Sequence, residues 1–487
     1  MPENKVIWQI SDKFDSITEK YSPQTMLGEY FSIYKPEIVE IIEYYLFNLN
    51  KVNFYKVNEW PVLTKWKYSF ILPLKKYCSF FNKNKFHPTK NEYSLLIIIE
   101  TKSHFNEYIS IRDELNRRNL SHKLVFFEPP PNWVKLPSND VVIISNMYKR
   151  LDYFIGLIQL LAINLFFLFS GVLKNFSTKN YKLLFTEIIL LNSKTIIDSY
   201  ITKKTFQRLS NKNLKTVIFF KAEGIKIRSL IKLFNKLNKK TISIQHGFIS
   251  ENIKYNNLDV DKYLVWSKKF SEKLNLSSSN CEHLPVGCAH YDEMFNYRKI
   301  AIQKNSNYRL KNLRLIFLPN SGNSQTSNEE VQFALNLCLE YYVNNKNVQL
   351  AIKPHPGSNE QRFIKKIEKE NNYSSVKLID KYDKINLDNY DIAITMNSTI
   401  GIESAIQQTP LIIILSNKTN LMVEDYINYR IGEFVDSYER LDKAIIKIKS
   451  NYKDYQENTK TFLDDFLINQ GKATDKIVNY ISSTINK

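Results

Sequence analysis

Cysteine is scarce in this chain of 487 residues, which has four cysteines and no Cys-X-X-Cys pair. So few cysteines at such spacings exclude a disulfide-stapled scaffold. Cys281 and Cys288 lie near His283 and His290 in the sequence, but their spacing does not fit a structural zinc site. We therefore expect no bound metal ion and no resident cofactor.

Acidic residues are in deficit as well. Asp and Glu number 49 against 68 Lys and Arg, which gives a formal net charge of +19. This surplus favours anionic partners such as phosphorylated substrates or anionic lipid headgroups, although a codon bias toward lysine would produce the same composition. The basic residues are dispersed, and no zinc-finger or RNA-binding motif accompanies them. We expect no nucleic-acid partner.

Long apolar segments are scarce too, and the chain has only one. The chain starts with the polar segment Met1–Lys5, which is not a secretory signal, so we expect a cytoplasmic protein. The run Phe154–Leu173 is long enough to span a bilayer. Strands on both sides of it belong to one expected sheet, however, and a single span would separate them. We expect a buried helix, or an in-plane helix that makes the protein peripheral on the anionic inner face of the membrane.

A chain of this length exceeds one ordinary core, so two or three domains are expected. Residues 1–90 are predicted to form a helical N-terminal region. Alternating apolar runs and helical segments then predict an α/β fold with two doubly wound, Rossmann-like domains facing across a cleft, at 91–298 and 311–487 with a linker around 298–310. The expected strands are 95–99, 124–127, 141–144, 216–220, 241–244, 263–266, 284–287, 313–318, 348–352, 376–379, 392–395 and 411–415.

The chain has only seven histidines, and one of them, His355, lies between two prolines directly after an apolar strand. Its backbone is therefore stiff, and it stands at the carboxyl end of a parallel strand, where open α/β sheets bind ligands. We expect His355 to contact a phosphate, with Lys353 adding positive charge. Asn320 and Ser321 follow another strand and are weaker candidates at the same edge.

A second segment follows strand 392–395 and begins a helix. Backbone N–H groups at such a start bind phosphate without a cationic side chain. Asn397, Ser398 and Thr399 would add polar groups, and Gly401 would allow close approach of a ligand. Glu403 lies four residues after Thr399 and hence on the same helical face. We expect phosphate at the helix start and ribose hydroxyls at Glu403.

The third segment is Ile244–Gly247, at the end of another strand. In a two-domain arrangement His246 faces the other domain, where it could act as a general base or touch the donor. His104, beyond the first strand, is a rival base, and Glu223, beyond strand 216–220, is a third. For His104 and Glu223 a solvated loop position is the alternative interpretation.

Together these segments resemble those of GT-B glycosyltransferases that build bacterial capsule and other surface polysaccharides, a group similar to the CDP-glycerol glycerophosphotransferases. The resemblance extends over about Tyr93 to Ile448. It rests on the segments Gln245–Gly247, Asp261–Trp266, Val286-Gly287 with Asp292, Lys353–Pro356, and Ser398-Thr399 with Glu403 and Pro410.

The resemblance implies a role for each matching residue. His246 would serve at the reaction centre, His355, Ser398 and Thr399 would hold the nucleotide phosphate, and Glu403 would bind the ribose. It implies a metal-independent reaction with a CMP-, CDP- or UDP-linked donor, and a glycan or lipid-linked acceptor. Because residues 397–399 read Asn-Ser-Thr where sialyltransferase-like members have Ser-Ser, the identity of the nucleotide stays open.

The expected function is therefore transfer of a sugar or polyol-phosphate from a nucleotide-activated donor to a surface glycan. A nucleotide-sugar epimerase of the UDP-N-acetylglucosamine 2-epimerase type would have the same two-domain fold. A non-catalytic subunit of a polysaccharide assembly machine is the alternative outside enzymology.

Overall fold

The computed structural model describes fifteen stretches of the chain, and all structural statements below refer to them. They are residues 93–129, 140–149, 151–152, 154–156, 158, 193–222, 225–249, 258–275, 281–301, 312–320, 328–355, 375–381, 383–396, 398–415 and 424–486. The N-terminal region 1–90, most of the apolar run 154–173, and the candidates Glu223, Ser321 and Asn397 lie outside them.

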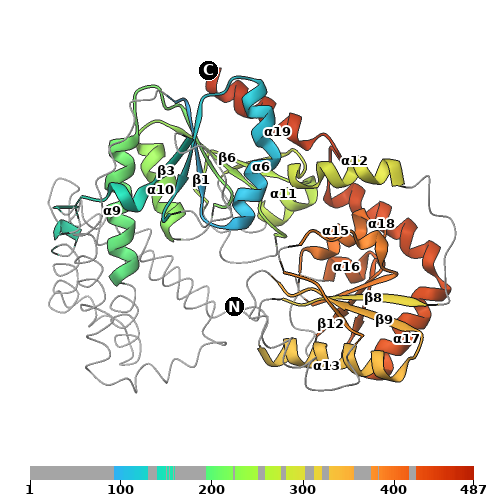
Figure 1. Cartoon of the computed structure of the whole chain (residues 1–487). Helices are drawn as coiled ribbons and strands as arrows, with labels where there is room; N and C mark the ends of the chain where they lie inside the picture. The colour runs from blue at the N-terminus through green and yellow to red at the C-terminus, as the bar shows by residue number, and fades with distance from the viewer. Residues whose placement is uncertain are drawn as a thin grey trace, which may run out of the picture.

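The first domain is built on a seven-stranded sheet with the order β3-β2-β1-β4-β5-β6-β7, in which every pairing is parallel (Figure 1). Its strands are continuous apolar runs because both faces of a parallel sheet are covered. Successive side chains of β1 accordingly enter opposite cores: Leu95 and Ile97 one, Leu96 and Ile98 the other. The strands are β1 (Leu95–Ile99), β2 (His122–Phe126), β3 (Val141–Ile143), β4 (Thr216–Phe219), β5 (Lys240–Ile244), β6 (Lys262–Val265) and β7 (Glu282–Pro285).

The second domain has a six-stranded parallel sheet with the order β10-β9-β8-β11-β12-β13. Its central strands are almost fully buried, whereas β10 at one edge is exposed. The strands are β8 (Leu313–Leu318), β9 (Val348–Ile352), β10 (Lys377–Leu378), β11 (Ile392–Thr395), β12 (Leu411–Ile414) and β13 (Gly432–Val435).

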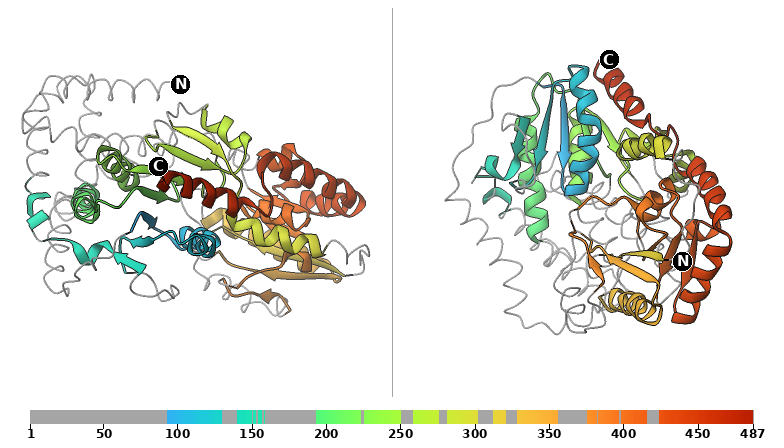
Figure 2. Two further views of the ribbon diagram at one scale, coloured as in Figure 1. Left: turned by 90° about the horizontal axis from the view of Figure 1, so that it is seen from above. Right: turned by 45° about the vertical axis from the view of Figure 1, so that its right-hand side comes forward.

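Helices cover both sheets (Figures 1 and 2). Those around the first sheet are α6 (Lys102–Arg117), η4 (Ile144–Met147), α9 (Ser193–Leu209), α10 (Ile225–Lys236), α11 (Lys268–Asn275), η7 (Ala289–Tyr291) and α12 (Asp292–Ala301). The remaining helices are α13 (Asn328–Asn344), η9 (Leu387–Asn389), α15 (Ile400–Ile406), α16 (Glu424–Asn428), α17 (Tyr438–Ser450), α18 (Tyr452–Phe466) and α19 (Ala473–Asn486).

The end of the chain returns to the first domain. In Figure 1, α19 lies beside α6, and its apolar face (Ile477, Val478, Ile481) joins the core under β1. The Asp292 carboxylate accepts hydrogen bonds from the backbone N–H groups of Ala473 and Thr474, at 3.0 and 2.7 Å, and so caps α19. Although the range 311–487 is predicted from the sequence as one domain, α19 packs on the first sheet.

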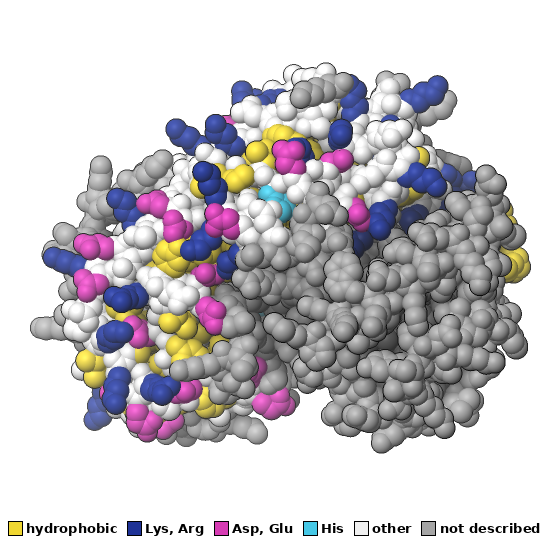
Figure 3. Space-filling view, turned by 180° about the vertical axis from the view of Figure 1, so that it is seen from behind, with side chains coloured by type: hydrophobic (Ala, Val, Ile, Leu, Met, Phe, Trp, Pro, Cys, Tyr) yellow, Lys and Arg dark blue, Asp and Glu magenta, His cyan; other side chains and the backbone are white. Residues whose placement is uncertain are grey.

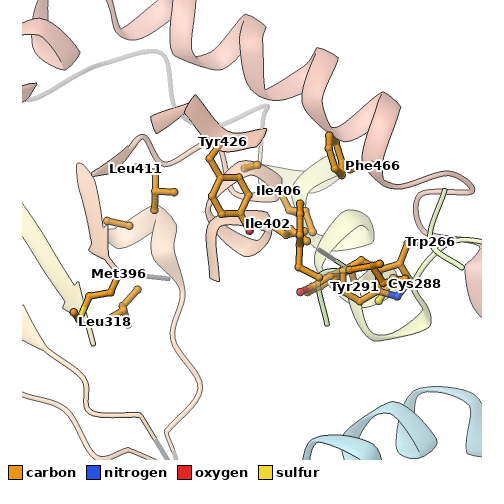
Figure 4. Close-up of a cluster of buried hydrophobic side chains, with 14 of the residues drawn as sticks. Trp266, Cys288, Tyr291, Leu318, Met396, Ile402, Ile406, Leu411, Tyr426 and Phe466 are labelled. Carbon is orange, nitrogen blue, oxygen red and sulfur yellow. The ribbon is translucent and has the colours of Figure 1, made fainter. Parts of the chain in front are cut away.

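An apolar interface joins the two domains. Figure 4 shows buried side chains continuing from Trp266 and Tyr291 to Tyr426 and Phe466. At its margin the Lys273 ammonium pairs with the Asp425 carboxylate at 2.5 Å, and both side chains are largely buried. One continuous core therefore fixes the domains against each other.

The predicted strands all occur, β1, β8, β9 and β11 with the predicted bounds. Helix α12 continues to Ala301, into the range expected as the linker, of which residues 302–310 lie outside the described residues. Strand β13 was not predicted, because only half of Gly432–Val435 is buried. Among the helices of the described residues, none combines the length and apolar character that crossing a membrane requires.

Candidate active site

The topology of the first sheet identifies one place where a ligand can bind. From β1 the chain adds β2 and β3 on one side and β4 on the other, so the strand order reverses between β1 and β4. Open α/β sheets bind ligands at the carboxyl ends of the strands at such a switch point. Here Glu100 follows β1 and Lys221 follows β4, and their side chains pair across the switch point at 2.7 Å.

His104 stands beside this ion pair, near the start of α6, whose N-cap Thr101 accepts a hydrogen bond from the His104 N–H. Its ring is 3% exposed. The backbone N–H of Glu100 donates to His104 Nδ1 at 3.4 Å, so Nδ1 carries no proton and a neutral ring has its proton on Nε2. Burial first, then His246 and Lys221, lower the pKa of His104 to about 2. The ring is therefore neutral, with an Nε2–H group that can donate a hydrogen bond.

His246 follows β5, and its ring lies edge-on to that of His104 with centroids 4.9 Å apart. Its Nδ1 lies 4.0 Å from Oε1 of Glu107, one turn further along α6 than His104. Glu107 is 8% exposed, and burial raises the pKa of its carboxyl to about 8. Two imidazoles and one buried acid therefore meet at the carboxyl edge of the first sheet.

The second sheet has its switch point between β8 and β11, because the chain adds β9 and β10 on one side of β8 and β11 on the other. The Thr395 hydroxyl donates to the Leu318 carbonyl at 2.8 Å and ties the ends of the two strands together. Asn320, beyond β8, is buried. Ser398 and Thr399 follow β11, so three of the predicted phosphate-site candidates flank this switch point.

The start of α15 is compact. Thr399 is its N-cap, with no side-chain capping bond, and the Ser398 hydroxyl accepts from the N–H of Ile400 at 3.3 Å. One turn on, burial raises the pKa of Glu403 to about 7, against the opposing effect of Lys353. A carboxyl with so raised a pKa keeps its proton to higher pH than an ordinary glutamate, so it can donate as well as accept a hydrogen bond.

Lys353 and His355 follow β9, which is separated from β11 by β8 alone. Two strand spacings of about 4.8 Å place the ends of β9 and β11 about 10 Å apart, a span that a nucleotide with its phosphates covers. The Lys353 ammonium donates to the Lys381 carbonyl at 3.1 Å. The His355 side chain is exposed, and its pKa is lowered by partial desolvation and by the Lys353 ammonium.

The carboxyl edges of the two sheets meet at the junction between the domains. Gly247, in the left-handed conformation at φ +79°, lies so close to α15 that a Cβ atom there would be 3.9 Å from Thr399 Cγ2. The next residue, Phe248, contacts the ring of Tyr426 at 5.7 Å between centroids, and the Tyr426 hydroxyl donates to the Ser398 carbonyl at 3.3 Å. The turn that carries His246 therefore abuts the start of α15.

Charges also gather at this junction. Desolvation lowers the pKa of Lys353, and the ammonium of Lys102, the first residue of α6, lowers it further, while Glu403 raises it. Tyr291 lies near both buried acids, since Glu403 and Glu107 contribute to raising its pKa after burial. Titratable side chains of the two domains therefore lie close enough to shift one another's pKa values.

Of the predicted site residues, His104 and His246 come together in the first domain, and Ser398, Thr399, Glu403, Lys353 and His355 border the same edge of the second. Glu223, Ser321 and Asn397 lie outside the described residues. Glu107, Tyr291 and Tyr426 were not predicted. One sequence feature could have identified Glu107: it lies three residues after His104, which puts both side chains on one helical face.

Within the described part of the chain, no three His, Cys, Asp or Glu side chains gather as a possible metal site. On the face in Figure 3, basic and acidic side chains alternate over the described surface of both domains. The positive charge therefore forms no single block on that face.

No family model matches the chain, and no curated protein matches it. Solved structures are similar to it. UDP-GlcNAc 2-epimerase from Methanocaldococcus jannaschii, in complex with UDP-GlcNAc and UDP, superposes with a TM-score of 0.52 at 15% identity, over 80% of this chain and 99% of that chain. The S. aureus MnaA–UDP co-structure gives 0.50 at 11% identity, over 81% and 97%. The wall teichoic acid polymerase TagF (H548A) gives 0.48 at 12%, over 88% and 99%.

The first two similarities define the class of fold. Two parallel sheets, each covered by helices and with the carboxyl ends of their strands meeting at a junction, form the two-domain GT-B α/β fold. At these identities the similarity establishes the fold alone.

Proposed function

We propose that this protein is a GT-B glycosyltransferase that moves a sugar or polyol-phosphate from a nucleotide-activated donor to a surface glycan or a lipid-linked acceptor. One observation carries the proposal. The His246–Gly247 turn of the first domain abuts the Thr399 start of α15 in the second, so the candidate base and the candidate phosphate-binding residues lie at one domain junction. Such an arrangement suits group transfer between two bound substrates.

The second domain would hold the donor. Lys353 would place its ammonium on the phosphates, with His355 donating a hydrogen bond and the start of α15 supplying backbone N–H groups. Glu403, which burial keeps partly protonated, would bind the ribose hydroxyls. These groups would stabilise the leaving phosphate without a metal ion. Structures of this fold solved with UDP or UDP-GlcNAc support a nucleotide-linked donor.

The first domain would hold the acceptor. When a sugar is transferred, an acceptor hydroxyl oxygen bonds to the anomeric carbon of the donor sugar as the bond from that carbon to the leaving phosphate oxygen breaks. His246 takes the hydroxyl proton as general base. His104, whose Nδ1 already accepts from the Glu100 N–H, would use Nε2–H to orient the incoming group.

Radiolabelled donors with and without a glycan acceptor test this function. A transferase moves label into the glycan only when the acceptor is present, and the variant His246→Ala lowers the rate by about 10²–10⁴-fold if it is the general base. Unchanged glycan synthesis in cells carrying His246→Ala would instead favour a non-catalytic assembly subunit.

A nucleotide-sugar epimerase is the second candidate. Its chemistry needs groups that remove a proton from one face of a sugar carbon and return a proton to the opposite face, and the cluster of Glu107, His104 and His246 would supply them. The same incubation separates the two functions, because an epimerase converts its substrate with no acceptor present.

A peripheral position on the anionic inner face of the cell membrane would fit an acceptor anchored in lipid. Leu151, Phe154 and Ile158 are at least half exposed and follow helical spacing, and Lys149 precedes them. Flotation with vesicles containing phosphatidylglycerol tests this position. Binding that is lost in a triple Ser variant of the three apolar residues supports it, and equal binding by that variant contradicts it.

A further inference from the structure

Glu107 lies close to the ring of His246, and the proposed reaction gives this carboxyl no role. It reaches the ring from a different element, α6, on the side opposite to the one that must face the acceptor: Oε1 lies 4.0 Å from Nδ1. Hydrogen bonds of catalytic groups are often long before substrate binds and shorten in the complex.

We propose that Glu107 is a positioning residue that decides which ring nitrogen of His246 carries the proton. This inference rests on the proposed role of His246 as general base. In that role Nε2 must have a free lone pair toward the acceptor, which requires the proton of the neutral ring to be on Nδ1.

The two protonation states of Glu107 have opposite effects. An ionised carboxylate can only accept, so it holds the proton on Nδ1 and leaves Nε2 free to act as a base. A neutral carboxylic acid donates to Nδ1, which leaves the proton on Nε2 and removes the lone pair from the reaction space. The first state is the active one and the second is the resting one.

The surroundings of Glu107 set the pH at which its carboxyl ionises. Burial raises its pKa to about 8, so the resting state predominates at neutral pH and the active state above it. The groups that face it come from three elements: His104 on α6, His246 after β5, and Cys288 and Tyr291 at η7. Burial raises the pKa values of Cys288 and Tyr291 well above their ordinary ranges, and that of His104 is about 2.

His104 cannot take over this function. Its Nδ1 accepts from the Glu100 backbone N–H, which fixes its tautomer independently of Glu107. Lys221, paired with Glu100, faces His104 and disfavours a charged ring there. The change of tautomer should therefore appear in the signals of one histidine.

The test uses the full chain labelled with ¹⁵N-histidine and NMR spectra that distinguish the protonated from the unprotonated ring nitrogen. The variant His246→Gln assigns the signals. Between about pH 7 and about pH 9.5, above the ordinary pKa of histidine, we expect the His246 proton to move from Nε2 to Nδ1 with a midpoint near 8. In Glu107→Gln, which has nearly the same shape but does not ionise, the tautomer should stay constant over this range.

Three further variants complete the design. Glu107→Asp keeps an ionisable group and should keep a transition with a displaced midpoint. Asp113→Asn, the same chemical change at an exposed position of α6, should leave the transition unaltered, as should Glu403→Gln. A constant tautomer in the wild-type protein, or an unaltered transition in Glu107→Gln, would overturn the inference. If the Glu107 variants do not fold, the wild-type titration alone decides, with a transition near 8 supporting it.

The readout does not depend on turnover. If the protein shows the tautomer change but has no transferase activity, the proposed function is contradicted and the Glu107–His246 interaction is supported. If the enzyme is active but its tautomer is constant, the proposed function stands and the Glu107–His246 interaction is excluded. In an active enzyme, we further expect kcat to rise about tenfold per pH unit below the midpoint and to lose that rise in Glu107→Gln.

Discussion

The ring of Tyr426 occupies the space that a Cβ atom on Gly401 would need: such an atom would lie 2.5 Å from Tyr426 Cζ. The ring stays there because it also packs on Phe248 of the first domain and its hydroxyl donates to the Ser398 carbonyl. One aromatic side chain thus connects the turn that carries His246 to the start of α15.

The variant Gly401→Ala tests this connection. The added methyl group must displace the buried ring, and overpacking of this kind costs about 1–3 kcal/mol of stability. Urea unfolding should show the loss in the wild-type background and little of it in a Tyr426→Ala background, where the space is empty. Equal losses in both backgrounds would mean that the ring does not limit the approach of α15.

Asp292 should anchor the last helix to the first domain. Its carboxylate caps α19 through two backbone N–H groups and is 9% exposed. Asp292→Ala leaves both donors without their partner, and a lost cap typically costs about 0.5–2 kcal/mol. Hydrogen exchange should rise in α19, whereas Asp475→Asn, at an exposed position of the same helix, should change it little. Unchanged exchange in Asp292→Ala would show that apolar packing alone holds α19.

Glu403 should make the protein less stable in alkali. Burial raises its pKa from 4.5 to about 7, so between these values the folded state binds more protons than the unfolded state. The contribution of Glu403 to the free energy of unfolding is present below about pH 4.5 and is lost as pH rises through about 7. Its upper bound is about 3 kcal/mol.

The variant Glu403→Gln removes that titration. The urea midpoint of the wild-type protein should fall from about pH 5 to about pH 8.5 by more than that of the variant. Glu107 titrates in the same direction in both proteins, so it cancels from the comparison. An equal fall in the two proteins would show that Glu403 is not desolvated in the folded state.

Much of the fold could be predicted because the strands are buried on both faces. Leu95–Ile99 and Val348–Ile352 read as apolar runs with clear ends, whereas β13 exposes part of Gly432–Val435 and gives no such signal. The start of α6 gives little signal in the sequence, since its cap is Thr101 and the polar first turn carries no apolar period.

The site could be predicted only where a motif carries its own chemistry. His246 and the Ser398–Glu403 segment stood out by their position after strands, a local property of the sequence. Glu107 was not predicted, because its burial beside the β5 turn depends on tertiary packing. Tyr426 belongs to α16, a helix of five residues, and its contact with Gly401 joins segments that the sequence does not relate.

Calorimetric titration with CMP, CDP and UDP tests the central claim, that the edge of the second sheet facing His246 binds a nucleotide phosphate. We expect at least one of the three to bind. Lys353→Met should weaken that binding about 10–100-fold, since a hydrogen bond to a charged group contributes about 1.5–3 kcal/mol. Lys346→Met, an exposed lysine before β9, should leave it unchanged. No binding of any of the three nucleotides, or equal binding by Lys353→Met, would contradict the account.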